Sequence, residues 1–148
     1  MIIDNLELTG ALQISLNNEI VHQCDNLVVT AGKEWVASRF KDTVGSGFTQ
    51  KAEMSHMALG TANTAAAVGN TALAAEISAS RIALTTDGGT VSNATVQYDA
   101  TWGSSHGAYA IQEAGIFNAA SGGDMLARTV FAIINKGTDD TVTISWTI

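Results

Sequence analysis

The chain ends on the stretch TVTISWTI, residues 141–148, in which polar and apolar side chains alternate without a break. The apolar members are Val142, Ile144, Trp146 and Ile148, and the polar members are threonines and one serine. A period of two is the period of a strand whose side chains point alternately to opposite faces. The stretch therefore predicts an antiparallel strand with one covered face and one face open to water or to a partner.

The same period recurs upstream. Leu12, Ile14 and Leu16 alternate with polar residues, and Tyr98 and Trp102 fall on one face of a longer alternating run. The strands expected from these patterns span residues 11–16, 19–23, 54–59, 81–85, 94–102, 109–117, 125–134 and 141–148. Turn residues separate them, including Asn17-Asn18, which suits a two-residue hairpin. These short strands predict a mainly β fold, an antiparallel β-sandwich or barrel-like module with one short α-helix.

The single helix is expected over residues 31–41. Thr30 is the predicted N-cap, because its hydroxyl can accept a hydrogen bond from an early backbone N–H. Trp35, Val36 and Phe40 fall on one face of this helix.

Three segments are expected to be loops. Residues 61–70 are small and aperiodic and predict an ordered loop, with a short helical turn possible in residues 71–76. The glycine-rich stretch 103–107 predicts a flexible loop tip, and residues 45–47 predict another loop.

Composition narrows the class of protein. The 148 residues correspond to one domain, residues 1–148, with a net charge of −7 and no proline. Ala, Thr, Gly and Ser together make 65 of the residues, a composition typical of a β-rich structural module. The acidic balance argues against a nucleic-acid partner, and no apolar run is long enough to span a membrane. The start of the chain lacks the features of a secretory signal. The single cysteine, Cys24, excludes an internal disulfide, so a reducing compartment during folding is acceptable.

The residues that most often carry chemistry form no recognisable motif. His22, His56 and His106 lack the spacing of a metal site, and Cys24 has only His22 near it in sequence, without a third group to orient a base. The stretch 103–107 lacks the lysine and following helix of a phosphate loop. We therefore expect no catalytic residue, no metal site and no cofactor.

Glu113 and the tryptophans are the residues that stand out. Glu113 interrupts an apolar strand, which predicts a buried carboxylate paired with Arg128 or Arg81. The tryptophans are expected to anchor the core or an interface. The candidate structural or interface residues are accordingly Trp35, Trp102, Glu113, Arg128 and Trp146.

A set of short segments gives the chain a familiar order. They are NLVVTAG (26–32), MALGT (57–61), TALAAE (71–76) with Arg81, IQEAGIF (111–117), MLAR (125–128), Lys136, and TVTISWTI (141–148). This order resembles small structural proteins of tailed bacteriophages. The C-terminal third also resembles the collar-type domain that attaches phage tail fibres.

The resemblance implies a non-enzymatic virion protein made in the bacterial cytoplasm. It implies contacts with further copies, in a homo-oligomer such as a trimer, and with the major capsid protein or tail proteins. No fibre shaft follows Ile148, which favours a capsid decoration (cement) protein over a small tail, collar, neck or baseplate component. A receptor- or carbohydrate-binding module that uses Trp102 and residues 103–107 as a platform is a further alternative, and an enzyme ranks last.

Overall fold

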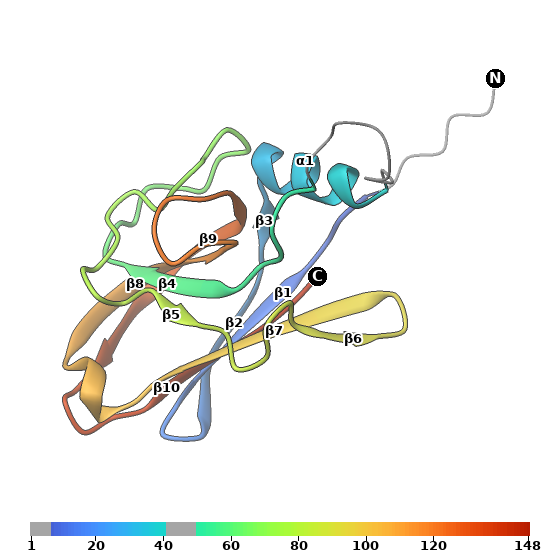
Figure 1. Cartoon of the computed structure of the whole chain (residues 1–148). Helices are drawn as coiled ribbons and strands as arrows, with labels where there is room; N and C mark the ends of the chain where they lie inside the picture. Colours follow the sequence, from blue (N-terminus) through green and yellow to red (C-terminus); the bar gives the residue numbers. More distant parts are fainter. Residues whose placement is uncertain (1–6, 41–49) are drawn as a thin grey trace.

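The computed structural model describes residues 7–40 and 50–148, which form two antiparallel sheets of five strands each (Figure 1). Sheet A has the order β2 (Glu19–Asp25), β1 (Ala11–Leu16), β10 (Val142–Thr147), β7 (Thr95–Trp102) and β6 (Thr90–Ser92). Sheet B has the order β3 (Leu27–Val28), β9 (Met125–Lys136), β8 (Tyr109–Phe117), β4 (His56–Gly60) and β5 (Ile82–Ala83). The predicted fold class, a mainly β and sandwich-like module, is confirmed.

The core lies between the two sheets and is built from their alternating positions. In β10 the buried residues are Val142, Ile144 and Trp146, as the C-terminal pattern predicts. Trp102 and Trp146 are both fully buried, and both belong to sheet A. Removal of apolar surface from water is the main source of stability here, at about 25 cal/mol for each Å².

The first hairpin has the predicted two-residue turn. Asn17 and Asn18 have φ values of 52° and 69°, the left-handed backbone that this turn requires. The Asn17 amide then donates to Asp140 Oδ1 at 2.8 Å, and the Thr141 N–H donates to Asn17 Oδ1 at 2.9 Å. The turn is thereby tied to the loop before β10. The hydrogen bond from Asn17 is the main reason that the pKa of Asp140 is lowered.

Helix α1 (Thr30–Arg39) lies where a helix is expected, but its start differs from the prediction. Val29 is the N-cap, and no side chain caps the helix, so the capping role predicted for Thr30 is wrong. The Thr30 N–H donates to the Val68 carbonyl at 2.7 Å, and the Val29 N–H donates to Leu126 O at 3.2 Å. Tertiary contacts with a loop and a strand therefore satisfy backbone donors at this end of the helix.

The buried face of α1 also differs from the apolar face read from the sequence. Phe40 is 79% exposed, whereas Gly32 and Ser38 are buried. Gly32 lies so close to the backbone of Leu126 that a Cβ atom would collide with it. Close backbone approach therefore sets how the helix packs on β9. Trp35 remains half-buried and donates from Nε1 to Ala52 O at 2.6 Å.

One loop prediction needs correction, and another lies outside the described residues. Residues 71–76 contain bends and no helical turn. The stretch 103–107 contains a short 3₁₀ helix, η1 (Ser104–His106), and Lys136 Nζ donates to Gly107 O at 2.7 Å, so this loop is tied to the end of β9. Residues 45–47 and Lys41 are outside the described part of the chain.

Within residues 7–40 and 50–148, no helix has the length and apolar character needed to cross a membrane.

The buried phenol of Tyr98 should make the free energy of unfolding fall at alkaline pH. Burial away from water raises the pKa of Tyr98 to about 12, from 10 for an exposed tyrosine. Stability is thus fully present below pH 10, and it falls as the pH rises from about 10 to 12, because only the unfolded chain ionises easily there. We expect the urea midpoint to fall across this range, and the fall to be smaller in Tyr98→Phe. Equal pH profiles for the two proteins would contradict the assignment.

Candidate functional site

A buried ion pair joins the two central strands of sheet B. Glu113 on β8 is 0% exposed and Arg128 on β9 is 1% exposed. Arg128 Nε and Nη2 both lie 2.8 Å from Glu113 Oε2. Of the two partners that the sequence offers for Glu113, the structure therefore selects Arg128. Ala114 and Ile116 alternate with Glu113 along β8 and point into the core. The pair therefore lies on the outer face of sheet B.

The other hydrogen bonds of Arg128 go to a loop. Nη1 donates to Ala65 O at 3.3 Å and to Asn70 Oδ1 at 3.0 Å, and Nη2 donates to Thr64 O at 2.9 Å. With the two contacts to Glu113, these bonds match the five N–H donors of a guanidinium group. The charge is buried and its donors are satisfied within the chain, which is the condition for tolerating a buried ion pair.

Glu113 binds the far end of the same loop. Its carboxylate accepts hydrogen bonds from the N–H groups of Ala75 at 2.7 Å and Ala74 at 3.1 Å. Opposite Glu113 on β4 stands Gly60, and a Cβ atom there would collide with the Glu113 carboxylate and lie 2.6 Å from Ala75 O. A residue without a side chain is therefore needed where the loop, the carboxylate and β4 meet.

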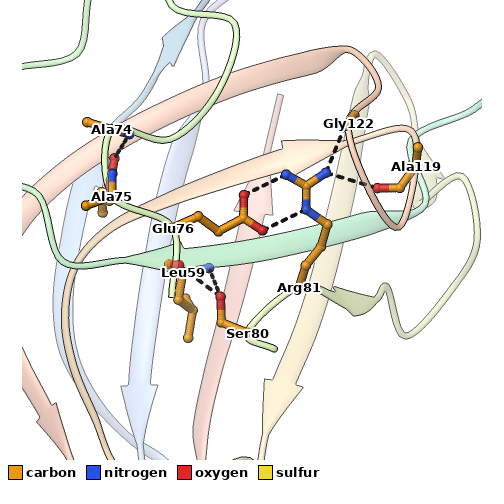
Figure 2. Close-up of polar contacts among 9 residues, drawn as sticks. Leu59, Ala74, Ala75, Glu76, Ser80, Arg81, Ala119 and Gly122 are labelled. Carbon is orange, nitrogen blue, oxygen red and sulfur yellow. Dashed lines mark hydrogen bonds and ion pairs between the residues drawn. The ribbon is translucent and has the colours of Figure 1, made fainter. Parts of the chain in front are cut away.

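A second ion pair fixes the segment that follows (Figure 2). Arg81 donates to both carboxylate oxygens of Glu76, at 2.9 and 2.7 Å. Its Nη1 donates to the carbonyls of Gly122 at 2.8 Å and Ala119 at 3.2 Å, in the turn between β8 and β9. The guanidinium also lies 3.7 Å from the ring centre of Phe117, within the range of a cation–π contact.

Ser80 closes the segment against β4. Its hydroxyl donates to Leu59 O at 2.9 Å and accepts from the Leu59 N–H at 3.0 Å, as Figure 2 shows. The Ser80 carbonyl in turn accepts from Trp102 Nε1 at 2.7 Å. We call residues 61–81 the anchored loop, because both of its ends and its middle are held by buried or half-buried polar groups.

The anchored loop presents backbone and small side chains to the outside. Ala65, Ala67, Ala72 and Ala74 are exposed, and Val68 is 55% exposed. Leu73 is its buried apolar residue and packs with Phe117 and Met125 on the outer face of sheet B. Arg128 and Glu113 therefore determine the shape of an exposed surface, and that surface is the candidate functional site.

The structure separates the other predicted site residues. Trp35 is part of α1, and the guanidinium of Arg39 lies 4.6 Å from its ring centre. Trp146 belongs to the core between the sheets. Trp102 is also fully buried, so it cannot form the binding platform that one alternative assigned to it.

The histidines and the cysteine lie apart from this site. His22 packs against Phe131 with ring centres 5.5 Å apart, and Cys24 Sγ lies 3.6 Å from Thr129 Oγ1. His56 is on β4 and His106 is in η1. In the part of the chain that the structure describes, no three His, Cys, Asp or Glu side chains lie close enough together to hold a metal ion.

Sequence reasoning missed Gly60, Asn70 and Ser80. Gly60 follows an apolar run and reads as a simple strand end, although its lack of a side chain makes room for Glu113. Asn70 and Ser80 lie among small polar residues that give no individual signal. Lys136 was named only for its place in the segment order, yet it is 2% exposed.

Comparisons with protein-family models, with curated proteins and with solved structures find no match to this chain. The interpretation of the site therefore depends on its geometry.

Loss of the buried carboxylate should strongly destabilise the protein. In Glu113→Ala, Arg128 keeps a buried charge without a counter-ion, and we expect a loss of about 3–5 kcal/mol in the free energy of unfolding. The N–H groups of Ala74 and Ala75 also lose their acceptor, so their hydrogen exchange should accelerate more than that of β10. Chemical denaturation and exchange measured by NMR test the two effects separately.

The control is Glu53→Ala, which removes a 68% exposed carboxylate 3.8 Å from Arg39. An exposed pair of this kind contributes only about 0–1 kcal/mol. Similar losses in the two variants would show that Glu113 is not a special anchor.

Gly60 allows a matched pair of substitutions in one region. Gly60→Ala places a methyl group against Ala75 O and the Glu113 side chain, and we expect it to destabilise the protein by about 1–3 kcal/mol. Gly69→Ala, in the same loop, meets no atom within 4 Å and should be neutral or slightly stabilising. Thermal denaturation of both variants tests this contrast, and an unchanged melting temperature in Gly60→Ala would refute the close packing.

Proposed function

We propose that this chain is a non-enzymatic structural protein of a bacteriophage virion. In this proposal it is a capsid decoration (cement) protein that packs on the particle through protein–protein contacts. The proposal places it in the virion, after assembly in the host cytoplasm, with further copies and the major capsid protein as partners.

The observation that carries the proposal is the use made of the buried charges. Arg128 gives its hydrogen bonds to Glu113, to two loop carbonyls and to Asn70, and Glu113 accepts two loop N–H groups. Arg81 binds Glu76 and two carbonyls of a neighbouring turn. These groups hold a surface of small residues in one shape, as a protein that must fit against another protein requires.

The open edges and the charge of the molecule also support the proposal. β2 and β6 are the edge strands of sheet A, and they carry exposed aliphatic side chains at Ile20, Val21 and Val91. Exposed strand edges and apolar side chains are common sites of association with another chain. The net charge of −7 suits the outside of a particle, since it discourages non-specific association and contact with DNA.

The copy number of this chain in purified virions tests the proposal. We expect quantitative mass spectrometry to find it at a stoichiometry comparable to that of the major capsid protein, because a decoration protein repeats over the head lattice. A small fraction of that copy number would overturn the decoration role in favour of a tail, collar or baseplate part. Absence from the virion would overturn the structural role altogether.

A further inference from the structure

The outer face of sheet A is a regular grid of mostly polar side chains. Leu12 on β1, Ile144 on β10 and Tyr98 on β7 point into the core. The residues that alternate with them along each strand therefore point away from the core. Across the strand registers, the rows of the grid are Asp25-Ala11-Thr147-Gln97, Gln23-Gln13-Ser145-Asp99 and Ile20-Ser15-Thr143-Thr101.

This face carries very little charge for the surface of a protein. The chain has seven lysines and arginines, and none of them lies on the five strands of sheet A. Only Asp25 and Asp99 are charged within the grid. Exposed surfaces of soluble domains usually mix charges of both signs at about a quarter to a third of positions. The rest of the molecule therefore carries all of the positive and most of the negative charge.

The side chains of the grid are already ordered by one another. Gln23 donates to Gln13 at 3.0 Å, Gln97 donates to Asp99 at 3.0 Å, and the hydroxyl groups of Thr101 and Thr143 lie 3.0 Å apart. Side chains held in this way lose less conformational freedom when a partner binds.

The grid also has relief. The glutamine pair of β1 and β2 stands beside a shallow hollow of about 500 Å³, whose lining includes the small residues Ala11, Ser145 and Thr147. On its other side the hollow is bounded by Gln97. A ridge of long side chains thus lies directly next to a trough of short ones.

We propose that this face is the contact surface for a second copy of the same chain. In a two-fold arrangement, the ridge of Gln13 and Gln23 on one copy lies in the trough over Ser145 on the other. A two-fold interface uses the same patch on both copies, so a patch that has a ridge next to a trough can fit against itself. The inference rests on the proposed function in one respect, which is that both include contacts with further copies of the chain.

Charge favours a second copy as the occupant. Two molecules of net charge −7 repel each other, so they can approach closely only through a face that carries little charge. Hydroxyl and amide groups both donate and accept hydrogen bonds, so two identical faces can satisfy each other without a charged counterpart.

The size of the face sets the strength of the contact. The four strands of the grid, at their usual spacing, present roughly 400 Å², which is below the ~800 Å² per partner of a stable complex. The contact should therefore be weak between free molecules and become occupied at high local concentration.

Sedimentation of the full chain from roughly 10 μM to 1 mM tests the proposal. We expect a dimer at the upper concentrations, and we expect added NaCl to strengthen it by screening the repulsion between copies. A contact built on ion pairs would weaken with salt. A monomer at every concentration would overturn the proposal. That result is expected if the face binds a saccharide or a different protein and not a second copy.

Two substitutions locate the contact. Ser145→Glu places a carboxylate in the trough, and Gln13→Glu changes one amide of the ridge to a carboxylate of nearly the same shape. Each should weaken the dimer about tenfold or more, because both copies then bring an added carboxylate into a contact made of neutral groups, where it loses water and adds to the repulsion between two acidic molecules. Circular dichroism and the melting temperature establish that both variants remain folded.

Thr71→Glu, on the exposed part of the anchored loop, is the matched control for added negative charge. It should leave the dimer nearly unchanged. A loss in Thr71→Glu equal to that in Ser145→Glu would overturn the assignment of this face.

The virion copy number is independent of these results. A dimer formed through sheet A by a chain that is absent from virions would keep this inference and refute the proposed function. A chain that is abundant in virions but forms no such dimer would keep the proposed function and refute this inference.

Discussion

The structure depends on one buried interaction, the ion pair between Glu113 and Arg128. Removing two charged groups from water is costly, and the attraction between them offsets that cost only if their remaining hydrogen bonds are also made. Here the guanidinium binds Thr64, Ala65 and Asn70, and the carboxylate binds two N–H groups of the same loop. The pair can therefore be buried only while the anchored loop is in place, and the loop has its shape only because the pair is buried.

This mutual dependence explains how the outer face of sheet B is covered. Glu113 and Gly115 of β8 offer little apolar surface on this outer face. Packing of apolar side chains alone therefore cannot cover it. The loop supplies Leu73 for the apolar part and backbone groups for the charged part. Backbone carbonyl and N–H groups are strong partners. A segment rich in alanine can therefore satisfy two buried charges with its backbone and one asparagine side chain.

The parts of the fold that the sequence could predict are those that depend on periodicity. The strand predicted over residues 109–117 has the bounds of β8, and its carboxylate among apolar residues indicated a buried pair. Alternation placed Trp102 and Trp146 on buried faces. The choice of Arg128 over Arg81 depends on strand register, which one chain segment does not reveal. The error at Thr30 has a similar origin, since the carbonyl of Val68, far away in sequence, satisfies its N–H. Contacts made by backbone atoms leave no mark on residue identity, so the hydrogen bonds of the anchored loop could not be read from the sequence.

The two sheets divide the tasks of the molecule. The outer face of sheet B is covered by the anchored loop, whose Leu73 packs there with Phe117 and Met125, and the buried pair of Glu113 and Arg128 lies beneath the same loop. The outer face of sheet A has hydrogen-bonding side chains that are already paired with one another. One face thus stabilises the fold by burying charge, and the grid on the other face carries only the two carboxylates of Asp25 and Asp99. For a molecule of net charge −7, that second arrangement makes sheet A the face where a like-charged copy meets the least electrostatic resistance.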